Sequence, residues 1–448
     1  MTQPQRPNIL FIFTDQQSAT MLSAAGNRYV STPGMDSIAA RGIQFKRAYC
    51  GNPMCVPSRF SLMTGRLPSA IRLRNNTDNH IDAIPHHIRQ NGLGWLLRNA
   101  GYKTAYGGKV HLPKGLTPED LGFDTISSDE RDALADTCAD FLAQPHDQPF
   151  FLVASFINPH DICHMAIRDF AETESEKRLS QPDRIELQEV DAALRLAKAF
   201  DRDDFFAWHC PPLPANYEIQ TDEPEAISQM QARSPFKRKA RAYYDEERWR
   251  LHRWVYARLT ERVDAQIGHV LQALQDSSHA QNTLVIFTSD HGDMDASHRM
   301  EHKTAFYEEA SRIPLLIAAP GMQHTGFVDT HLVSNGLDLL PTLCDYAGVA
   351  PPDDVQGASL RPLIEGQPVE HWRTALPVES EIGRMIVTER YKYMLHDEGA
   401  HREQLIDLLT DPGEMRNAAG DPQHHALMKN LREAFDRVFS EHASIKGG

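Results

Sequence analysis

Three apolar runs with polar residues directly after them stand out in the hydrophobic pattern of this chain. They cover residues 8–13, 150–156 and 283–288. Uninterrupted runs of this length are typical of strands buried on both faces, as in a parallel sheet covered by helices. An aspartate follows the first run and the last, at Asp15 and Asp290. Because open α/β sheets bind ligands at the carboxyl ends of their strands, we expect these polar groups to meet at one edge.

Helical periodicity fills the stretches between these runs. Residues 34–42 and 88–100 have the apolar spacing of short helices, and residues 101–106 follow as a short strand. Residues 249–274 have the spacing of a long amphipathic helix. Residues 165–245 are charged, weakly periodic and rich in proline, which we interpret as a helical insertion over the functional edge of the sheet.

The C-terminal part of the chain has a different pattern. A Pro-Pro-Asp-Asp stretch at 351–354 marks a domain boundary. Beyond it, short segments at 385–388, 391–394 and 404–408 predict an antiparallel meander, and residues 424–440 predict a closing helix. We therefore predict an α/β fold in which helices sandwich a large, mostly parallel or mixed sheet, with a smaller C-terminal α+β subdomain. The predicted units are residues 1–350 and 351–448.

Composition narrows the class of protein. Of the 448 residues, 41% are hydrophobic and 24% are charged, as in an ordinary soluble chain. The net charge of -15 argues against a nucleic-acid partner, and no stretch reaches the roughly 18 apolar residues of a membrane span. The short polar N-terminus and six scattered cysteines lead us to expect a cytoplasmic protein, unless a leader has been removed.

A cysteine motif indicates the chemistry. The segment CVPSR, which begins at Cys55, is followed by TGR at 64–66. The pentapeptide alone also fits a free cysteine in a proline-rich turn. Together with the triplet it resembles the signature of type I, formylglycine-dependent sulfatases, which have the alkaline phosphatase-like fold. The resemblance implies that a maturation enzyme oxidises Cys55 to formylglycine, and that the hydrated aldehyde is the nucleophile.

The resemblance extends to two polar pairs at strand ends and implies a metal site. Asp15 and Gln16 match the first pair of ligands in the family, and Asp290 and His291 match the second, with the modified Cys55 as a further ligand. A divalent cation there would polarise the sulfate oxygens and lower the pKa of the aldehyde hydrate. Carboxylate and amide oxygens suit Ca²⁺, whereas the imidazole makes Mn²⁺ or Mg²⁺ admissible.

Further motifs of the family imply charges and proton carriers. A GKVH segment matches the family pattern Gly-Lys-x-His, which implies that Lys109 holds a sulfate oxygen and that His111 accepts a proton during sulfate elimination. His160 and Lys303 match positions that act at the leaving oxygen. Arg59 is implied to bind the formylglycine oxygen and to orient the metal carboxylates. Each of these segments, taken alone, also fits an exposed loop.

Three more residues near the motifs are candidate substrate contacts. Asn76 lies shortly after the signature segment, where relatives place polar residues that bind substrate. His164 and His302 lie close to motif positions in the sequence. For both histidines, a surface position without a direct role is the alternative.

These motifs together predict hydrolysis of a sulfate ester, with a sulfated carbohydrate as the expected small-molecule or oligosaccharide substrate. The alternative is a phosphonate monoester or phosphodiester hydrolase with the same nucleophile. Gln16 and His291 favour that alternative, whereas Lys109 and His111 count against it. A catalytically silent scaffold is a third interpretation, and the complete set of polar positions argues against it. A homo-oligomer is expected from base rates alone.

Overall fold

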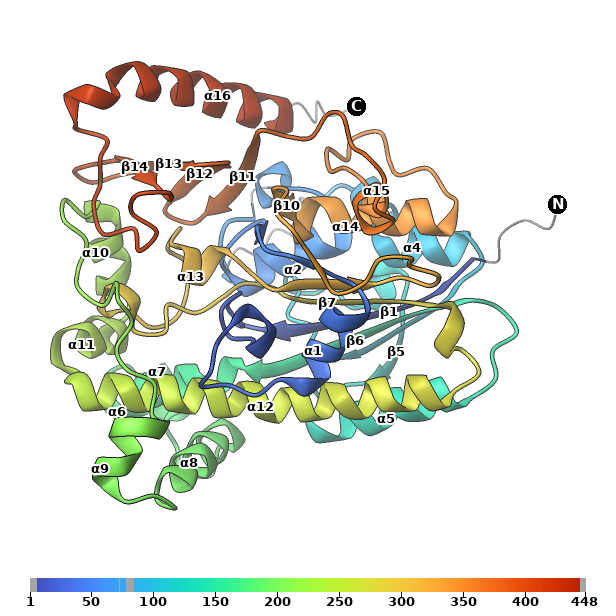
Figure 1. Cartoon of the computed structure of the whole chain (residues 1–448), viewed down its shortest axis with the longest axis horizontal. Helices are drawn as coiled ribbons and strands as arrows, with labels where there is room; N and C mark the ends of the chain where they lie inside the picture. The colour runs from blue at the N-terminus through green and yellow to red at the C-terminus, as the bar shows by residue number, and fades with distance from the viewer. Residues whose placement is uncertain (1–5, 72, 78–83, 444–448) are drawn as a thin grey trace.

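A large sheet lies between two layers of helices in the computed structural model, which describes residues 6–71, 73–77 and 84–443 (Figure 1). Its strands are β1 (Asn8–Asp15), β2 (Ile43–Phe45), β4 (Lys103–Gly108), β5 (Asp124–Ser127), β6 (Phe150–Pro159), β7 (Thr283–Ser289), β8 (Leu315–Ala318) and β9 (Phe327–Asp329). In space they follow the order β5-β4-β6-β1-β7-β8-β2-β9. The part from β5 to β7 is parallel, and β8 pairs antiparallel with both β7 and β2.

β1 occupies the centre of the parallel part. It pairs with β6 on one side and with β7 on the other, so that Asp15 lies opposite Pro159 and Thr14 lies opposite Ser289. Because the three strands run the same way, their carboxyl ends meet at one edge of the sheet. The three strands predicted from the apolar runs are present, and the predicted fold class is confirmed.

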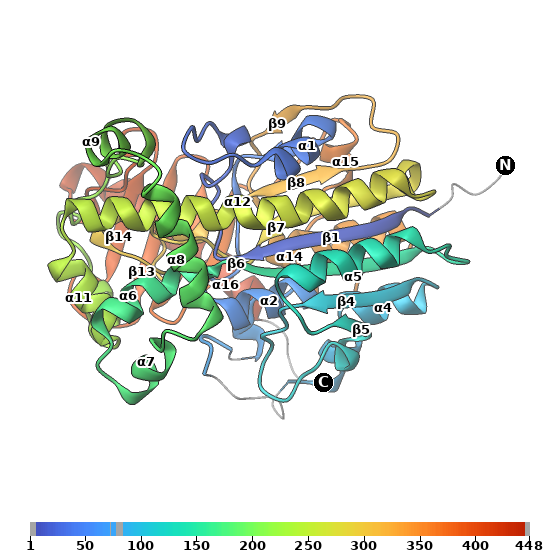
Figure 2. The ribbon, with the colours of Figure 1, turned by 90° about the horizontal axis from the view of Figure 1, so that it is seen from below.

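Both faces of β1 are buried, and each contributes to a different hydrophobic core. Ile9, Phe11 and Phe13 face one core, and Leu10 and Ile12 face the other. The first core includes α2 (Cys55–Thr64), α4 (Leu93–Asn99) and α14 (Asn335–Ala347), and the second includes α1 (Pro33–Arg41), α5 (Asp132–Ala143) and α12 (Glu246–Asp276). Figure 2 shows α5 and α12 running along the second face. Burying each large apolar side chain contributes about 1.5–3 kcal/mol, which is why the strand needs no polar face.

The long helix α12 spans 31 residues and begins three residues before the predicted start. The carboxylate of Asp245 caps it by accepting a hydrogen bond from the backbone N–H of Arg248 at 2.8 Å. α1 packs closely against α12 because Gly34 has no side chain: a Cβ there would lie 2.8 Å from the carbonyl oxygen of Asp264. The Asp264 carboxylate also accepts from the backbone N–H of Gly34 at 2.9 Å, which joins the two helices.

The region between β6 and α12 is helical. Its helices are α6 (Cys163–Phe170), α7 (Glu174–Leu179), α8 (Ile185–Ala197), α9 (Arg202–Asp204), α10 (Glu225–Ala232) and α11 (Pro235–Tyr243). Trp249 of α12 is buried in a small core with residues of α6 and α11, and Trp254 in another with residues of α6 and α8. Among the described residues, no helix combines the length and the apolar character that a membrane crossing requires. The cytoplasmic location and the homo-oligomeric state stay predictions.

A second, smaller sheet lies beneath α16 (His425–Ala443) near the end of the chain (Figure 1). Its antiparallel strands are, in spatial order, β11 (Ala375–Ser380), β12 (Gly383–Thr388), β13 (Tyr391–His396) and β14 (Glu403–Asp407). The last three strands and the helix correspond to predicted segments. β11 was not predicted, because Pro377 and Glu379 interrupt the apolar pattern typical of a strand.

The prediction of one continuous helix at 88–100 is wrong. This segment is divided into α3 (His86–Gln90) and α4, and Gly92 between them has extended backbone with φ -82° and ψ 168°. A Cβ at Gly92 would lie 3.1 Å from the carbonyl oxygen of Met63, so the chain passes close to α2 at this point. A glycine at such a close approach interrupts the helix despite favourable periodicity on both sides.

The chain between the two sheets remains attached to the first. Leu360, Leu363 and Ile364 are buried in the core that covers one face of the large sheet. The small sheet begins only at Ala375. The division of the chain near residue 350 stays a prediction.

A buried lysine connects the small sheet to the rest of the molecule. The ammonium of Lys392 on β13 donates to Glu414 at 2.6 Å and to the carbonyl oxygen of Phe306 at 2.6 Å, and it lies 3.2 Å from Glu308. Its side chain has no exposed surface. Burial alone would lower the pKa of Lys392, but the two carboxylates raise it. The lysine is therefore charged at neutral pH.

Replacing this lysine tests the connection. We expect Lys392→Met to lower the free energy of unfolding by about 3–5 kcal/mol, because two carboxylates lose their buried counter-charge. Urea unfolding followed by circular dichroism measures the change. Lys429→Met, at an exposed position of α16, is the control and should change stability by less than about 0.5 kcal/mol. A loss below about 1 kcal/mol for Lys392→Met would contradict a connecting role.

Candidate active site

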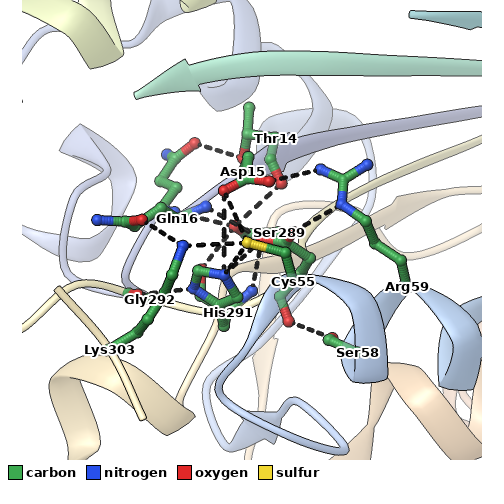
Figure 3. Close-up of polar contacts among 12 residues, drawn as sticks. Thr14, Asp15, Gln16, Cys55, Ser58, Arg59, Ser289, His291, Gly292 and Lys303 are labelled. Carbon is green, nitrogen blue, oxygen red and sulfur yellow. Dashed lines mark hydrogen bonds and ion pairs between the residues drawn. The ribbon is translucent and has the colours of Figure 1, made fainter. Parts of the chain in front are cut away.

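Strand ends and one helix start bring polar side chains to the same edge of the large sheet (Figure 3). Asp15 is the last residue of β1, and Asp290 follows β7 directly. Lys109 follows β4, and His160 follows β6. Cys55 is the first residue of α2, which covers one face of the sheet. The parallel topology therefore places groups that are far apart in the sequence around the sulfur of Cys55.

The thiol of Cys55 lies at the centre of this group and is only 1% exposed. Its sulfur is 3.0 Å from Nζ of Lys303, 3.2 Å from Nε2 of His291 and 3.7 Å from Oδ1 of Asp15. Burial and the charge of Asp15 would raise the pKa of the thiol, but Lys303 and His291 outweigh them and hold this pKa well below its usual value. The position is thus built to hold negative charge on the atom that residue 55 presents.

Arg59, one turn further along α2, holds the two aspartates in place. Its Nη2 donates to Oδ2 of Asp15 at 2.8 Å, and its Nε donates to Oδ2 of Asp290 at 2.9 Å. Its Nη1 donates to the carbonyl oxygen of Lys109 at 3.0 Å and to the hydroxyl of Ser155 at 2.9 Å. The guanidinium is 1% exposed, and the charges of Asp290 and Asp15 raise its pKa despite burial. Arg59 therefore acts as a buried clamp between β1 and β7.

Each aspartate uses one carboxylate oxygen for Arg59 and keeps the other near Cys55. Oδ1 of Asp15 lies 3.9 Å from Nε2 of His291, and Oδ1 of Asp290 lies 3.6 Å from the same nitrogen. The ligand atoms of Asp15, Cys55, Asp290 and His291 all lie within 4.8 Å of one another. This spacing and donor set can hold one divalent cation.

The orientation of His291 also suits a metal ligand. Its Nδ1 lies 2.9 Å from the carbonyl oxygen of Gly292, an acceptor that requires a proton on Nδ1. The lone pair of the neutral ring is therefore on Nε2, which faces the carboxylates and Cys55. A backbone carbonyl bound to the second nitrogen is the usual way in which proteins orient a histidine ligand.

Gln16 borders this group through Lys303. Its Oε1 accepts a hydrogen bond from Nζ of Lys303 at 2.7 Å, and its Nε2 donates to Asp293 at 2.6 Å. The same ammonium reaches the sulfur of Cys55, as Figure 3 shows. Asp293 thus fixes which end of the amide faces the site, because a carboxylate can only accept from the NH₂ end.

Lys109 supplies a second ammonium at the edge of the sheet. Its Nζ lies 2.7 Å from Oδ2 of Asp15. Burial alone would raise the pKa of Asp15, but the charges of Lys109 and Arg59 lower this pKa well below its usual value. Burial and the neighbouring Asp15 raise the pKa of Asp290 to about 6. The two carboxylates share a small volume that a cation would neutralise further.

The two catalytic histidines predicted from the sequence have different surroundings. His160 follows Pro159, which lies opposite Asp15 in the sheet, and burial and the charge of Lys109 lower the pKa of His160 well below its usual value. His111 lies in the loop after β4, is exposed, and makes no hydrogen bond or ion pair with any described residue. The structure therefore brings His160 into the group and leaves His111 outside its hydrogen-bond network.

The three predicted substrate contacts lie at different places relative to Cys55. The side-chain oxygen of Asn76 accepts from the backbone N–H of Val56 at 3.0 Å, next to Cys55. Nδ1 of His164 lies 3.2 Å from the carbonyl oxygen of Leu179, which ties α6 to the end of α7. His302 is buried, and its ring lies 5.1 Å from that of Phe236 on α11.

Sequence reasoning missed three polar residues at this edge. Asp293 accepts a hydrogen bond from Gln16, and Ser155 accepts one from Arg59. The third is Lys237 of α11, whose pKa is affected by the charge of Lys303. The position of Asp293, three residues after Asp290, was a usable signal. Ser155 lies inside an apolar strand, and Lys237 lies among charged residues, so neither could be distinguished in the sequence.

Comparison with known proteins agrees with this geometry. Residues 7–349 match the family described as Sulfatase, and residues 296–441 match N-sulphoglucosamine sulphohydrolase, C-terminal. The chain is 31% identical over 455 residues to Delta 4,5-hexuronate-2-O-sulfatase of Bacteroides thetaiotaomicron. The alignment covers 96% of this chain and 88% of the relative.

Solved structures extend the likeness to the fold. A 2-O GAG sulfatase superimposes with a TM-score of 0.80 at 27% identity, covering 98% of this chain and 93% of the other. A phosphonate monoester hydrolase of Agrobacterium radiobacter shares the fold with a TM-score of 0.71 at 23% identity, covering 98% and 96%. The chain therefore belongs to the sulfatase family of the alkaline phosphatase-like superfamily, and the protein is a sulfuric ester hydrolase.

Proposed function

We propose that this protein hydrolyses a sulfate ester of a sulfated carbohydrate, with a formylglycine formed from Cys55 and one divalent cation. The observation that carries the proposal is the ring of charged groups around the sulfur of Cys55, with Lys303 at 3.0 Å and His291 at 3.2 Å. The choice of a carbohydrate is supported by the likeness to a hexuronate-2-O-sulfatase over 96% of the chain. A formylglycine-generating enzyme is the partner that the modification requires.

The residues present fit a cation of the hard type. Asp15 and Asp290 each leave one carboxylate oxygen free of Arg59, and Nε2 of His291 faces the same space and can bind a cation when it carries no proton. Gln16 is the proposed fourth protein ligand beside residue 55. Two carboxylates and an amide favour Ca²⁺, and the imidazole leaves Mn²⁺ and Mg²⁺ as the alternatives. A cation held here would draw charge from the sulfate oxygens and favour attack at sulfur.

The side chains around residue 55 have separable roles in the proposed reaction. With formylglycine at position 55, its hydrate would supply the attacking oxygen. Lys109 provides a fixed charge for a sulfate oxygen, because it is held next to Asp15. Arg59 orients the two carboxylates, and its proposed further role is to bind the oxygen of formylglycine at position 55.

His160 and Lys303 are proposed to act at the leaving oxygen, which takes up a proton from the ammonium of Lys303 as the S–O bond breaks. The lowered pKa leaves His160 neutral at pH 7, so its ring can donate a hydrogen bond to the leaving oxygen. Lys303 is charged, since Cys55 and Asp15 raise its pKa despite burial, and it can offset the charge that develops on that oxygen. His111 is proposed to accept a proton during sulfate release, from its exposed position in the loop after β4.

The second candidate is hydrolysis of a phosphonate monoester or a phosphodiester. His291 in the metal cluster and Gln16 beside it favour this candidate, and a phosphonate monoester hydrolase shares the fold. Lys109 and His111 argue for a sulfate ester instead, because the Gly-Lys-x-His segment that contains them matches the sulfatase pattern. One panel of substrates separates the two.

Substrate turnover tests the proposed nucleophile. Protein co-expressed with a formylglycine-generating enzyme should release sulfate from a sulfated monosaccharide, and Cys55→Ala should reduce kcat by at least about 10³-fold because the nucleophile is lost. The panel also contains an aryl sulfate, a phosphonate monoester and a phosphodiester, with ion chromatography as the readout. Faster turnover of the phosphonate or the diester than of any sulfate would favour the second candidate.

Metal removal tests the cation. We expect a chelator to lower kcat/KM by about 10²-fold or more, since the charge that polarises the sulfate is gone. Added Ca²⁺ should restore it and should also raise the thermal midpoint of the protein, because the ion binds only the folded state. Asp290→Asn is the matched variant and should weaken both responses. Full activity in metal-free protein, verified by elemental analysis, is the result that would exclude the cation.

The leaving-group dependence tests Lys303. Lys303→Gln should reduce kcat/KM about 10²-fold for a sugar sulfate and much less for 4-nitrophenyl sulfate, because an aryloxide needs little help to leave. Lys239→Gln, on the surface of α11, is the control. Equal losses on both substrates would assign Lys303 to sulfate binding instead of the leaving oxygen.

A further inference from the structure

We propose that Lys237 forms a second anion-binding subsite beside the sulfate site, which takes a carboxylate or a second sulfate group of the sugar. The inference rests on the proposed function, and it narrows the substrate to saccharides with at least two negative groups. Lys237 comes from α11 of the helical insertion, whereas the groups around Cys55 come from the edge of the sheet and from α2.

The packing of α11 places Lys237 near the site. α11 lies against α6, and Phe236 is buried in the same small core as Cys163 of α6. The ring of Phe236 lies 5.1 Å from the ring of His302, the neighbour of Lys303. Nζ of Lys237 lies 6.0 Å from the centre of the Phe236 ring. The ammonium is therefore in the same region as His302 and Lys303.

Lys237 has no ionic partner among the described residues. On the same helix, Lys239 pairs with Glu172, and Arg241 pairs with Glu223 at 2.6 Å. The side chain of Lys237 makes no hydrogen bond or ion pair with residues 6–71, 73–77 or 84–443. Its side chain is partly exposed, so a ligand can reach it.

The two carboxylates whose charges act on Lys237, those of Glu381 and Asp293, have other partners. Glu381 lies 4.0 Å from Arg233. Asp293 accepts from Nε2 of Gln16 at 2.6 Å and from the backbone N–H of His302 at 3.0 Å. Neither carboxylate therefore forms an ion pair with Lys237.

Other charges around Lys237 increase the need for an anion. Burial and the charge of Lys303 lower the pKa of Lys237, and Lys237 in turn contributes to the lowered pKa of His302, whose main cause is burial. Burial raises the pKa of Cys163 to about 12, so this neighbouring thiol is neutral. Two ammonium groups in one region, one of them without an ion pair, favour binding of a negative group.

The scissile sulfate does not need Lys237. Lys303 and Lys109 already lie around residue 55, at 3.0 Å from Cys55 and 2.7 Å from Asp15. A further anion on the same sugar is the group that would compensate Lys237. A carboxylate on a uronic acid and a second sulfate ester share the required chemistry, whereas a neutral sulfated hexose would leave the ammonium unpaired.

Binding to protein without turnover tests the subsite. In the Cys55→Ala background, calorimetry compares glucuronate 2-sulfate with glucose 2-sulfate, which differ only in the carboxylate. A second pair, glucosamine 2-N,6-O-disulfate and N-acetylglucosamine 6-O-sulfate, has an N-sulfate in one member and a neutral N-acetyl group in the other. Lys237→Gln should weaken binding of the doubly charged member of one pair about tenfold more than that of its singly charged partner.

The two pairs distinguish the two sources of the second anion. An effect confined to the first pair identifies a carboxylate, and an effect confined to the second identifies a sulfate. Lys239→Gln, two residues along the same helix, should leave both pairs unaffected. Equal weakening of both members of each pair, or no binding of any of the four sugars, overturns the subsite. Sulfate release by the matured wild-type protein decides the proposed function separately, because it does not depend on Lys237.

Discussion

The pairing of one buried guanidinium with two buried carboxylates is the interaction on which the site depends. Asp15 and Asp290 have no exposed surface, and their parallel strands place them side by side. Two carboxylates in such a position repel each other and lose hydration, and each cost amounts to several kcal/mol unless a counter-charge is present. Arg59 provides that counter-charge with a planar, forked geometry that lysine cannot reproduce.

The clamp also determines the direction in which the carboxylates point. Arg59 occupies the outer oxygen of each aspartate, so the remaining oxygens converge near residue 55. Its third nitrogen reaches Ser155 and the backbone of Lys109, which connects β4 and β6 to the same network. The residues that act on the sulfate group thus come from the sheet and α2. The residue proposed to recognise the sugar comes from the helical insertion. Such a division would allow specificity to change without disturbing the charged centre.

The sequence predicted the elements of the fold that have strong local patterns. β1, β6 and β7 were identifiable because both faces of each strand are buried, and Asp15 and Asp290 because they directly follow two of these strands. β11 and the break at Gly92 depend on close contacts with distant segments, which periodicity does not register. The grouping around Cys55 was predicted only through the resemblance of its motifs to a family. Lys237 could not be found in this way, because an unpaired lysine is recognisable only when its neighbours in space are known.

The burial of Cys55 has a consequence for the order of events in the life of the chain. In the folded protein the thiol is 1% exposed, and Ser58 and Arg59 of the same motif are equally inaccessible. An enzyme that recognises this segment and oxidises its cysteine needs the peptide in an extended, accessible form. The proposed modification therefore has to take place during synthesis or before α2 docks onto the sheet. Chains that fold before modification would remain stable, well-packed molecules without the formylglycine nucleophile. The active fraction of a preparation would then depend on the rate of cysteine oxidation relative to the rate of folding.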